Sequence, residues 1–307
     1  MRIAVIGQGS AGRRFLKNLN ELNKNIETHS FPSSKNKKKI NVKTNYLHKD
    51  LDNFNDYYFD RVIIASPSSY HFSHLRIIKD KNLPILIEKP VCSSSKQIQN
   101  IRNLNFSNLI VAYCFRFDAA ARKVKKEIKK LGKIHNVISY ASSYLPDWRS
   151  TPYRKSVSAN KKLGGGVLLE LSHEIDYLIW LFGGMDVISS KICNTNTLDI
   201  NVEDCADAFF ETKNNTKIFL HLDFMQKRNE RFLIVFGEKG KISWNLITDE
   251  VFYDDKIIFS KKQNQQNMFF DMTKSFINRR NFSEFASIEE SFEVVSLIDE
   301  IKALSKN

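Results

Sequence analysis

The sequence has no apolar run near the roughly 20 residues that a membrane-spanning helix requires, so we expect no membrane segment. Its first residues enter a short apolar run without the longer apolar stretch and small-residue cleavage site of a secretory signal, which predicts a cytoplasmic protein. Cysteine is scarce and scattered, with no Cys-x-x-Cys pair and no matching histidine spacing, at Cys92, Cys114, Cys193 and Cys205. This spacing indicates neither a disulfide framework nor a zinc site, and predicts reduced, mostly buried thiols.

Acidic residues are outnumbered, because 34 Asp and Glu against 47 Lys and Arg give a formal net charge of +13. Lysine is densest at residues 35–39 and 123–130, but no nucleic-acid-binding module or basic-aromatic pattern accompanies it. We expect no nucleic-acid partner, and a basic nucleic-acid-binding protein is kept as a competing hypothesis. A basic surface favours anionic small molecules, such as a dinucleotide or a phosphorylated substrate.

The 307 residues are too many for one small core and favour two domains. Residues 1–117 alternate apolar runs with helical segments, which predicts a doubly wound parallel α/β sheet of the Rossmann type, with strands at 3–6, 26–30, 61–65, 85–88 and 109–112. Residues 118–307 predict an α+β domain with a largely antiparallel open sheet, from strand-like runs at 134–140, 207–211, 218–224, 232–236 and 241–244. Helices are expected at 119–131, at 167–182 and at about 287–304.

A glycine-rich turn joins the first predicted strand to a segment with helical spacing of apolar residues. Backbone N–H groups at such a strand–turn–helix junction point at a phosphate, so the turn is predicted to bind the pyrophosphate of a dinucleotide. The cofactor-binding residues predicted there are Gly7, Gln8, Gly9, Ser10, Ala11 and Gly12. The alternative is that the glycines only form a tight turn.

The next three predicted strands also end in residues suited to a cofactor. The second lacks the acidic residue that binds the adenosine ribose hydroxyls of NAD, and offers a 2′-phosphate site instead, which predicts NADP in preference to NAD. Ligands of parallel sheets bind beyond the carboxyl ends of the strands, so the polar residues there are expected beside the cofactor. They are Ser33, Ser34 and Lys35 after the second strand, Ser66, Pro67 and His71 after the third, and Glu88 and Lys89 after the fourth. The alternative for Lys89 is a surface lysine at a strand end.

Three polar residues stand at helical spacing in an otherwise apolar segment of the second domain: Glu170, His173 and Asp176. The spacing puts them on one face of a helix, and polar groups on a buried face need hydrogen-bond partners or a functional role. The alternatives to a catalytic set are a core histidine satisfied by Asp176 or a backbone carbonyl, and a metal site, for which no further ligands stand at fixed spacing. Arginine suits bidentate binding of a carboxylate or phosphate, and the residues that precede them are Arg116, Trp148, Arg149, Tyr153, Arg154 and Lys155. The alternative is that half of these are simply solvated loop residues.

In their order and spacing these motifs resemble the glucose-fructose oxidoreductase, inositol dehydrogenase and MocA family (Gfo/Idh/MocA) of nicotinamide-dependent oxidoreductases, across essentially the whole chain. The resemblance implies that Lys89 lies beside the nicotinamide ribose and the reacting hydroxyl, and that His173 transfers the proton. It implies substrate-binding roles for Glu170, Asp176, Arg116, Trp148, Tyr153 and Arg154. The chain departs from the family pattern because Glu170 precedes the histidine by three residues, where members commonly carry an aspartate four residues before it.

Physical chemistry supports this division of roles. Hydride transfer from an alcohol carbon also requires the hydroxyl proton to leave, and a histidine with a pKa near about 6.5 suits that transfer at neutral pH better than a lysine near about 10.4. Lys89 would orient the hydroxyl and stabilise negative charge on its oxygen, or act as the base itself if burial lowers its pKa.

The predicted function is an NAD(P)-dependent oxidoreductase acting on a secondary hydroxyl or ketone of a sugar, cyclitol or sugar nucleotide. The segment 148–166 is similar to that of family members involved in surface-glycan biosynthesis, which favours an activated or acidic sugar. The alternative is a catalytically silent, cofactor-binding regulatory protein of the same fold. Relatives often pair through the open face of the second sheet, which implies a homodimer or homotetramer.

Overall fold

The computed structural model describes residues 1–23, 25–34, 41–260, 265–278 and 282–306. The chain forms two compact units, of which the first comprises Met1–Cys114 with Phe269–Val295, and the second Phe115–Met268 with the segment from Ser296 onward. The first unit thus ends before the expected boundary at residue 117, and it takes in residues 269–295, which the sequence analysis assigned to the second domain. Among the described residues, no helix is both long and apolar enough to cross a membrane.

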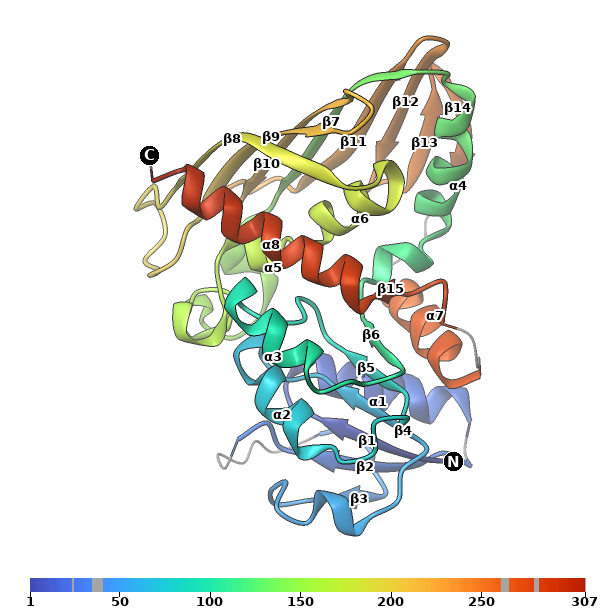
Figure 1. The fold of residues 1–307 in the computed structure, drawn as a ribbon, viewed down its shortest axis with the longest axis vertical. Helices are drawn as coiled ribbons and strands as arrows, with labels where there is room; N and C mark the ends of the chain where they lie inside the picture. The colour runs from blue at the N-terminus through green and yellow to red at the C-terminus, as the bar shows by residue number, and fades with distance from the viewer. Residues whose placement is uncertain (24, 35–40, 261–264, 279–281, 307) are drawn as a thin grey trace. The chain divides into compact units, whose positions relative to one another are not determined.

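A seven-stranded sheet forms the core of the first unit, in the order β15-β6-β5-β4-β1-β2-β3 (Figure 1). Its strands are β1 (Arg2–Ile6), β2 (Glu27–Phe31), β3 (Tyr46–Leu47), β4 (Arg61–Ile64), β5 (Ile85–Ile87), β6 (Leu109–Val111) and β15 (Ala286–Ser287). All neighbouring pairs are parallel except β15 with β6. The predicted doubly wound parallel sheet and its five strands are confirmed. The strand order reverses at β1, which lies between β2 and β4, and such switch points are where these sheets bind ligands.

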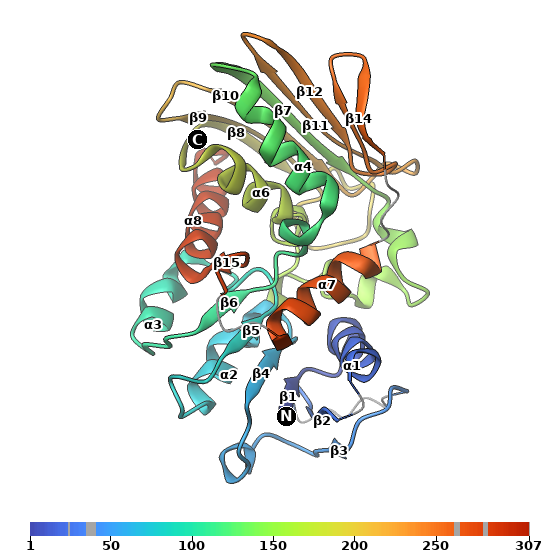
Figure 2. The ribbon, with the colours of Figure 1, turned by 90° about the vertical axis from the view of Figure 1, so that its right-hand side faces the viewer.

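Two pairs of helices lie on opposite faces of this sheet (Figure 2). The first pair is α1 (Ser10–Leu22) and residues 269–278 of α7 (Gln265–Asn278), joined by an edge contact of the Phe15 and Phe269 rings at 5.8 Å and by a 3.0 Å hydrogen bond from Asn18 to Thr273. The second pair is α2 (His71–Ile77) and α3 (Ile98–Arg102). The contacts of α7 with α1, together with the pairing of β15 with β6, explain why residues 269–295 belong to the first unit.

An eight-stranded sheet forms the second unit, in the order β14-β13-β12-β11-β7-β10-β9-β8. Its strands are β7 (Ile134–Ser142), β8 (Met185–Cys193), β9 (Cys205–Thr212), β10 (Lys217–Asp223), β11 (Glu230–Gly237), β12 (Gly240–Asn245), β13 (Glu250–Tyr253) and β14 (Lys256–Ser260). Only β7 and β10 pair in parallel, so the predicted largely antiparallel sheet is confirmed. The strands β8, β13 and β14 were not predicted.

Helices cover one face of this second sheet (Figure 1). They are α4 (Ala119–Glu127), α5 (Val167–Glu170), α6 (His173–Phe182) and the later part of α8 (Ile288–Leu304). Side chains alternate along the strands, so that Ala206, Ala208 and Phe210 of β9 are buried while the residues between them are at least partly accessible. The opposite face therefore remains open and carries exposed apolar side chains such as Ile138 and Phe219.

The prediction of one helix at 167–182 is wrong. α5 ends at Glu170 and α6 begins at His173, because the backbone leaves the regular helix at Leu171, with φ of −96° and ψ of 26°. The break falls between Glu170 and His173, so these two do not share one continuous helical face. Asp176 is only 1% exposed, whereas Glu170 and His173 are half-buried.

Candidate active site

The glycine-rich turn lies at the carboxyl end of β1 and opens α1. Gly7 has φ of +120°, and a Cβ at this position would lie 2.4 Å from the carbonyl oxygen of Ala65, which follows β4. A Cβ on Gly12 would lie 1.7 Å from the carbonyl oxygen of Gly7. The backbone N–H of Gly7 also donates to the carbonyl of Phe31 at the end of β2. Both glycines are therefore required for the first turn of α1 to approach the ends of the three central strands.

Gly9 differs from these two glycines. Its φ of −76° and ψ of −167° suit any residue, and no described atom lies within 4 Å of its Cβ position. It is the N-cap residue of α1 and has no side chain to accept a hydrogen bond from the first-turn N–H groups of Ser10, Ala11 and Gly12. An open space beside an uncapped helix N-terminus fits a pyrophosphate, which a Cβ at Gly9 would obstruct.

His71 joins the loops that follow β4 and β5. Its side chain is fully buried, with Nε2 2.9 Å from the carbonyl oxygen of Ser66 and Nδ1 3.2 Å from that of Val91. Burial lowers the pKa of His71 to about 4, so near neutral pH the ring is neutral and donates one hydrogen to one of these carbonyls. His71 thereby holds the loop carrying Pro67 next to the loop carrying Lys89. This is a positioning role, and direct contact of His71 with the cofactor stays a prediction.

The end of β2 is tied to the loop after β4 through a second histidine. Ser66 Oγ lies 2.9 Å from His74 Nδ1, and His74 Nε2 lies 3.2 Å from the carbonyl oxygen of Ser33. Ser33 is half-buried and Ser34 is exposed, while Lys35 lies outside the described residues. Two of the three residues predicted to hold a 2′-phosphate are thus placed at the carboxyl end of β2.

Lys89 follows β5 in the same row of strand ends. Its side chain is half-buried, as is that of Glu88, whose Oε2 accepts a 3.2 Å hydrogen bond from the backbone N–H of Lys89. Within the first unit, the structure thus brings the glycine turn, the Ser66 loop and the Lys89 loop to the ends of neighbouring strands, as the sequence predicts.

Arg116 and Asp176 form a buried ion pair in the second unit. The Nη2 atom of Arg116 lies 2.7 Å from Asp176 Oδ1, its Nε lies 3.2 Å from both carboxylate oxygens, and the two side chains are 2% and 1% exposed. The pair fixes α6 against the segment that precedes α4. That Arg116 and Asp176 bind substrate stays a prediction.

His173 is the first residue of α6 and packs against an aromatic cluster. The Phe115 ring meets the imidazole edge-on at 5.2 Å, and Tyr177 and Trp244 pack against Phe115 in turn. The hydroxyl of Tyr177 lies 2.7 Å from Ser139 Oγ, and burial raises the pKa of Tyr177 well above its ordinary value. This packing restrains the helix turn that carries His173.

Sequence reasoning missed a second ion pair beside His173, of which the carboxylate is buried. Glu174 is fully buried and binds the guanidinium of Arg231, which lies over the Phe115 ring at 4.5 Å. No local signal marks this pair, because 57 residues separate its members and Arg231 stands in an ordinary strand pattern.

The segment 148–155 lies at the surface of the second unit. Trp148 Nε1 donates to Ser143 Oγ at 3.0 Å, and Trp148 and Tyr153 line a small hollow together with Leu145 and Thr151. Arg154 pairs with Asp199 at 2.8 Å, and both side chains are more than half exposed. Trp148 and Tyr153 are therefore placed around a recess, whereas Arg154 does not line it. Its ion pair with Asp199 is exposed and contributes little to stability.

Two family models match this chain. The model described as "Oxidoreductase family, NAD-binding Rossmann fold" matches residues 1–107, and the "GFO/IDH/MocA C-terminal domain" matches residues 121–243. A curated relative, the rhizopine catabolism protein MocA of Rhizobium meliloti, is 28% identical over 130 residues, which are 40% of this chain and 38% of that protein.

Solved structures share the fold along the whole chain. A myo-inositol 2-dehydrogenase from Lactobacillus plantarum superposes with a TM-score of 0.79 at 17% identity, covering 100% of this chain and 97% of that one. The WlbA dehydrogenase from Bordetella pertussis, in complex with NADH and UDP-GlcNAcA, gives 0.78 at 15% identity with coverage of 100% and 97%. A biliverdin reductase from Synechocystis, in complex with biliverdin and NADP+, gives 0.78 at 13% identity with coverage of 100% and 99%. Together with the two family matches, the parallel sheet and its glycine turn, these findings show that the chain belongs to the Gfo/Idh/MocA family of oxidoreductases, with an NAD-binding Rossmann fold.

Proposed function

We propose that the protein transfers a hydride between NADP or NAD and a secondary hydroxyl, or the corresponding ketone, of a sugar, cyclitol or sugar nucleotide. The observation that carries this proposal is the open cradle at Gly9, flanked by Gly7 and Gly12, which tolerate no side chain. When bound, the nicotinamide supplies the hydride donor or acceptor. A myo-inositol dehydrogenase and an enzyme bound to UDP-GlcNAcA among the structural neighbours support the substrate class.

An anionic, activated sugar of the kind used in surface-glycan synthesis suits the charge of the loop that precedes α5. Exposed basic residues gather there, at Arg149, Arg154, Lys155, Lys161 and Lys162. Such a cluster attracts carboxylate and phosphate groups, although pairing with Asp199 offsets part of the charge of Arg154.

We assign proton transfer to His173 and the holding of the reacting oxygen to Lys89. An imidazole exchanges protons near neutral pH, and an ammonium group stabilises negative charge on an alkoxide-like oxygen. Arg116 and Asp176 act as positioning residues in this scheme, because their buried pair fixes the helix that begins with His173. Glu170, half-buried at the end of α5, is the group proposed to contact substrate hydroxyls.

We propose NADP as the preferred cofactor. The carboxyl end of β2 runs through Phe31 and Pro32 to Ser33 and Ser34, without the acidic side chain that would bind ribose hydroxyls and repel a 2′-phosphate. Calorimetric titration with each cofactor tests the preference, and tighter binding of NAD than of NADP would refute it.

We propose that the protein forms a homodimer or homotetramer through the open face of the second sheet. Ile138, Ile188, Phe219 and Ile257 are 36% to 52% exposed, and side chains of this kind gathered on one surface are typical of an interface. Light scattering after gel filtration gives the mass in solution, and Phe219→Glu should shift it toward the monomer. A wild-type monomer would contradict the proposal.

Steady-state kinetics test the catalytic assignment. Lys89→Ala and His173→Ala should each lower kcat about a hundredfold to ten-thousandfold on whichever sugar is turned over, while the cofactor Kd changes little. The matched controls are Lys96→Ala for Lys89→Ala and His135→Ala for His173→Ala. Each control removes an exposed residue of the same type from the same unit. Near-wild-type rates in both active-site variants would refute the assignment, and a regulatory protein would show no turnover at all.

A further inference from the structure

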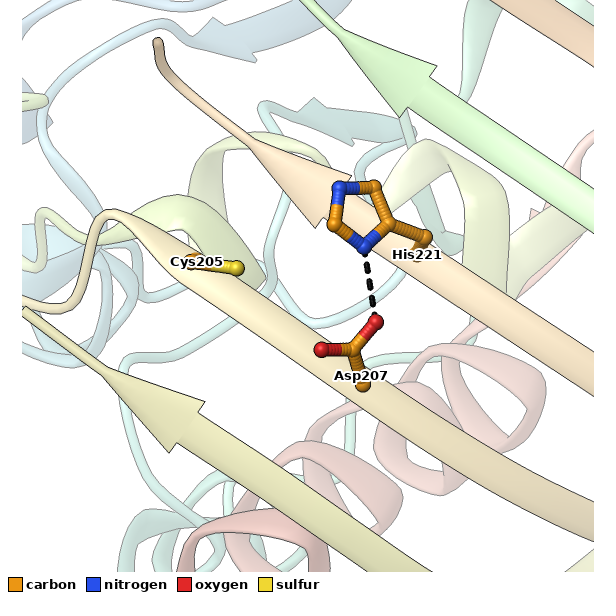
Figure 3. Close-up of side chains that lie close together, drawn as sticks. All are labelled: Cys205, Asp207 and His221. Carbon is orange, nitrogen blue, oxygen red and sulfur yellow. Dashed lines mark hydrogen bonds and ion pairs between the residues drawn. The ribbon is translucent and has the colours of Figure 1, made fainter. Parts of the chain in front are cut away.

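Three side chains of types that can bind metal ions lie close together on the open face of the second sheet (Figure 3). Cys205 and Asp207 stand two residues apart on β9, so both point to this face, and His221 is directly opposite Asp207 on β10. The thiol, one carboxylate oxygen and one ring nitrogen all lie within 4.8 Å of one another. None of these residues has a part in the proposed oxidoreductase reaction.

His221 has a carboxylate at each of its ring nitrogens. Nδ1 lies 2.7 Å from Asp207 Oδ1, and Nε2 lies 3.0 Å from Asp223 Oδ2. A neutral imidazole carries a single N–H, so one contact would set a nitrogen lone pair against a carboxylate oxygen. A positive charge at that nitrogen, either a second proton or a metal ion, makes both contacts favourable.

Asp223 is built to orient His221. It is only 4% exposed, and its Oδ1 accepts hydrogen bonds from the backbone N–H groups of Met225 at 2.7 Å and Gln226 at 3.2 Å. A fixed carboxylate that holds one nitrogen of a histidine while the other nitrogen binds a metal is the usual second layer of a metal site. His221 would accordingly use Nδ1, the atom that faces Asp207 and Cys205, for the ion.

A second thiol borders the cluster. Cys193 is directly opposite Cys205 in the pairing of β8 with β9. Cys193 is exposed, so its side chain has room to rotate. The prediction of mostly buried thiols thus holds for Cys92 and Cys114 but is wrong for Cys193 and Cys205, because their strands turn them to the open face.

We propose that Cys205, Asp207 and His221 bind a zinc ion, with Asp223 orienting His221 and Cys193 adjacent to the fourth position. A thiolate, an imidazole and a carboxylate form a ligand set typical of zinc, whereas magnesium and calcium take oxygen ligands. Ligands of a tetrahedral zinc ion stand about 3.5 Å apart, as bond lengths of about 2.0 to 2.3 Å require, so small side-chain rotations complete the site. The ion would cross-link β9 and β10.

Metal titration of the full chain tests the proposal. The reduced, chelator-treated protein is titrated with Co²⁺, which reports a thiolate ligand by a charge-transfer band, and then with Zn²⁺, which should displace it. Wild type should bind one equivalent. Cys205→Ser, Asp207→Asn and His221→Gln should each weaken binding by at least about tenfold, the lower end of the loss known for second-layer partners.

His135→Gln is the matched control, because His135 is an exposed histidine of the same sheet outside the cluster. It should bind Co²⁺ and Zn²⁺ as wild type does, and circular dichroism should show the same fold in all variants. Because Cys193 stands beside the fourth position, the double variant Cys193→Ser/Cys205→Ser is titrated as well. The proposal is overturned if this double variant retains the charge-transfer band, or if His221→Gln binds Zn²⁺ as tightly as His135→Gln. It is also overturned if Cys193 and Cys205 form a disulfide and the reduced protein binds no zinc.

Discussion

Replacing Asp176 with leucine should destabilise the second unit by about 3 to 5 kcal/mol. The substitution removes the carboxylate that pairs with the Arg116 guanidinium, which is 2% exposed, and breaking a buried ion pair by removing one partner costs that much. Arg116→Met should lower the free energy of unfolding by a similar amount, because it removes the cation that pairs with the buried Asp176 carboxylate. The double variant Arg116→Met/Asp176→Leu should lie within about 2 kcal/mol of wild type, because replacing both members of a buried ion pair with apolar residues of similar size is often close to neutral.

Urea unfolding followed by tryptophan fluorescence measures this effect in the relevant unit, because all three tryptophans, Trp148, Trp180 and Trp244, belong to it. With a slope of about 2 kcal/mol per molar urea, each single variant should lower the midpoint by about 1.5 to 2.5 M. If Asp176→Leu lowers stability by less than 1 kcal/mol but raises KM, the carboxylate binds substrate and our assignment of a positioning role is wrong.

Two further predictions concern the first unit. Gly9→Val should leave the free energy of unfolding within about 1 kcal/mol of wild type, while calorimetry should detect no binding of either cofactor. Gly12→Ala should lower the free energy of unfolding by about 3 kcal/mol, because its Cβ would lie 1.7 Å from a carbonyl oxygen. Equal effects of the two substitutions on the free energy of unfolding would contradict this prediction. Burial lowers the pKa of His71 to about 4, so the unfolded chain, with a pKa near about 6.5, binds the proton first as pH falls. The contribution of neutral His71 to the free energy of unfolding is therefore fully present above about pH 6.5. As the pH falls from about 6.5 to 4, up to about 3 kcal/mol of it is lost. The free energy of unfolding of His71→Gln should therefore fall less than that of wild type between about pH 6.5 and 4, as measured by urea unfolding followed by circular dichroism. Burial raises the pKa of Asp118 to about 6, so Asp118 changes stability in the opposite direction, equally in wild type and variant.

Features that depend on neighbouring residues could be predicted from the sequence. The strand before Gly7, the spacing to Gly12 and the position of Lys89 after an apolar run all follow from local pattern. The structure places the glycine turn and Lys89 at the carboxyl ends of β1 and β5, the two neighbours of β4. The two-residue strand β15 could not be predicted, because its only role is to extend the edge of β6 from 175 residues further along the chain.

Pairings between distant segments escaped prediction for the same reason. Asp176 was expected beside substrate, but its partner Arg116 stands 60 residues earlier and no periodicity links them. The break at Leu171 contains neither glycine nor proline, so the apolar run across it suggested one helix. The cluster of Cys205 and His221 arises only from strand pairing, which a search for cysteine spacing does not detect.

The chain passes between the two units three times, at residues 114–115, 268–269 and 295–296. Neither unit is therefore a continuous stretch of sequence that can be expressed alone by cutting the gene once. A fragment ending at residue 117 would lack α7, leaving the side of Phe15 that meets Phe269 open to water, and would lack β15, leaving the hydrogen-bonding edge of β6 unpaired. Unpaired strand edges and exposed aromatic rings promote aggregation. A fragment of the cofactor-binding unit that stays monomeric in solution would therefore have to include residues 269–295, for example through a circularly permuted gene.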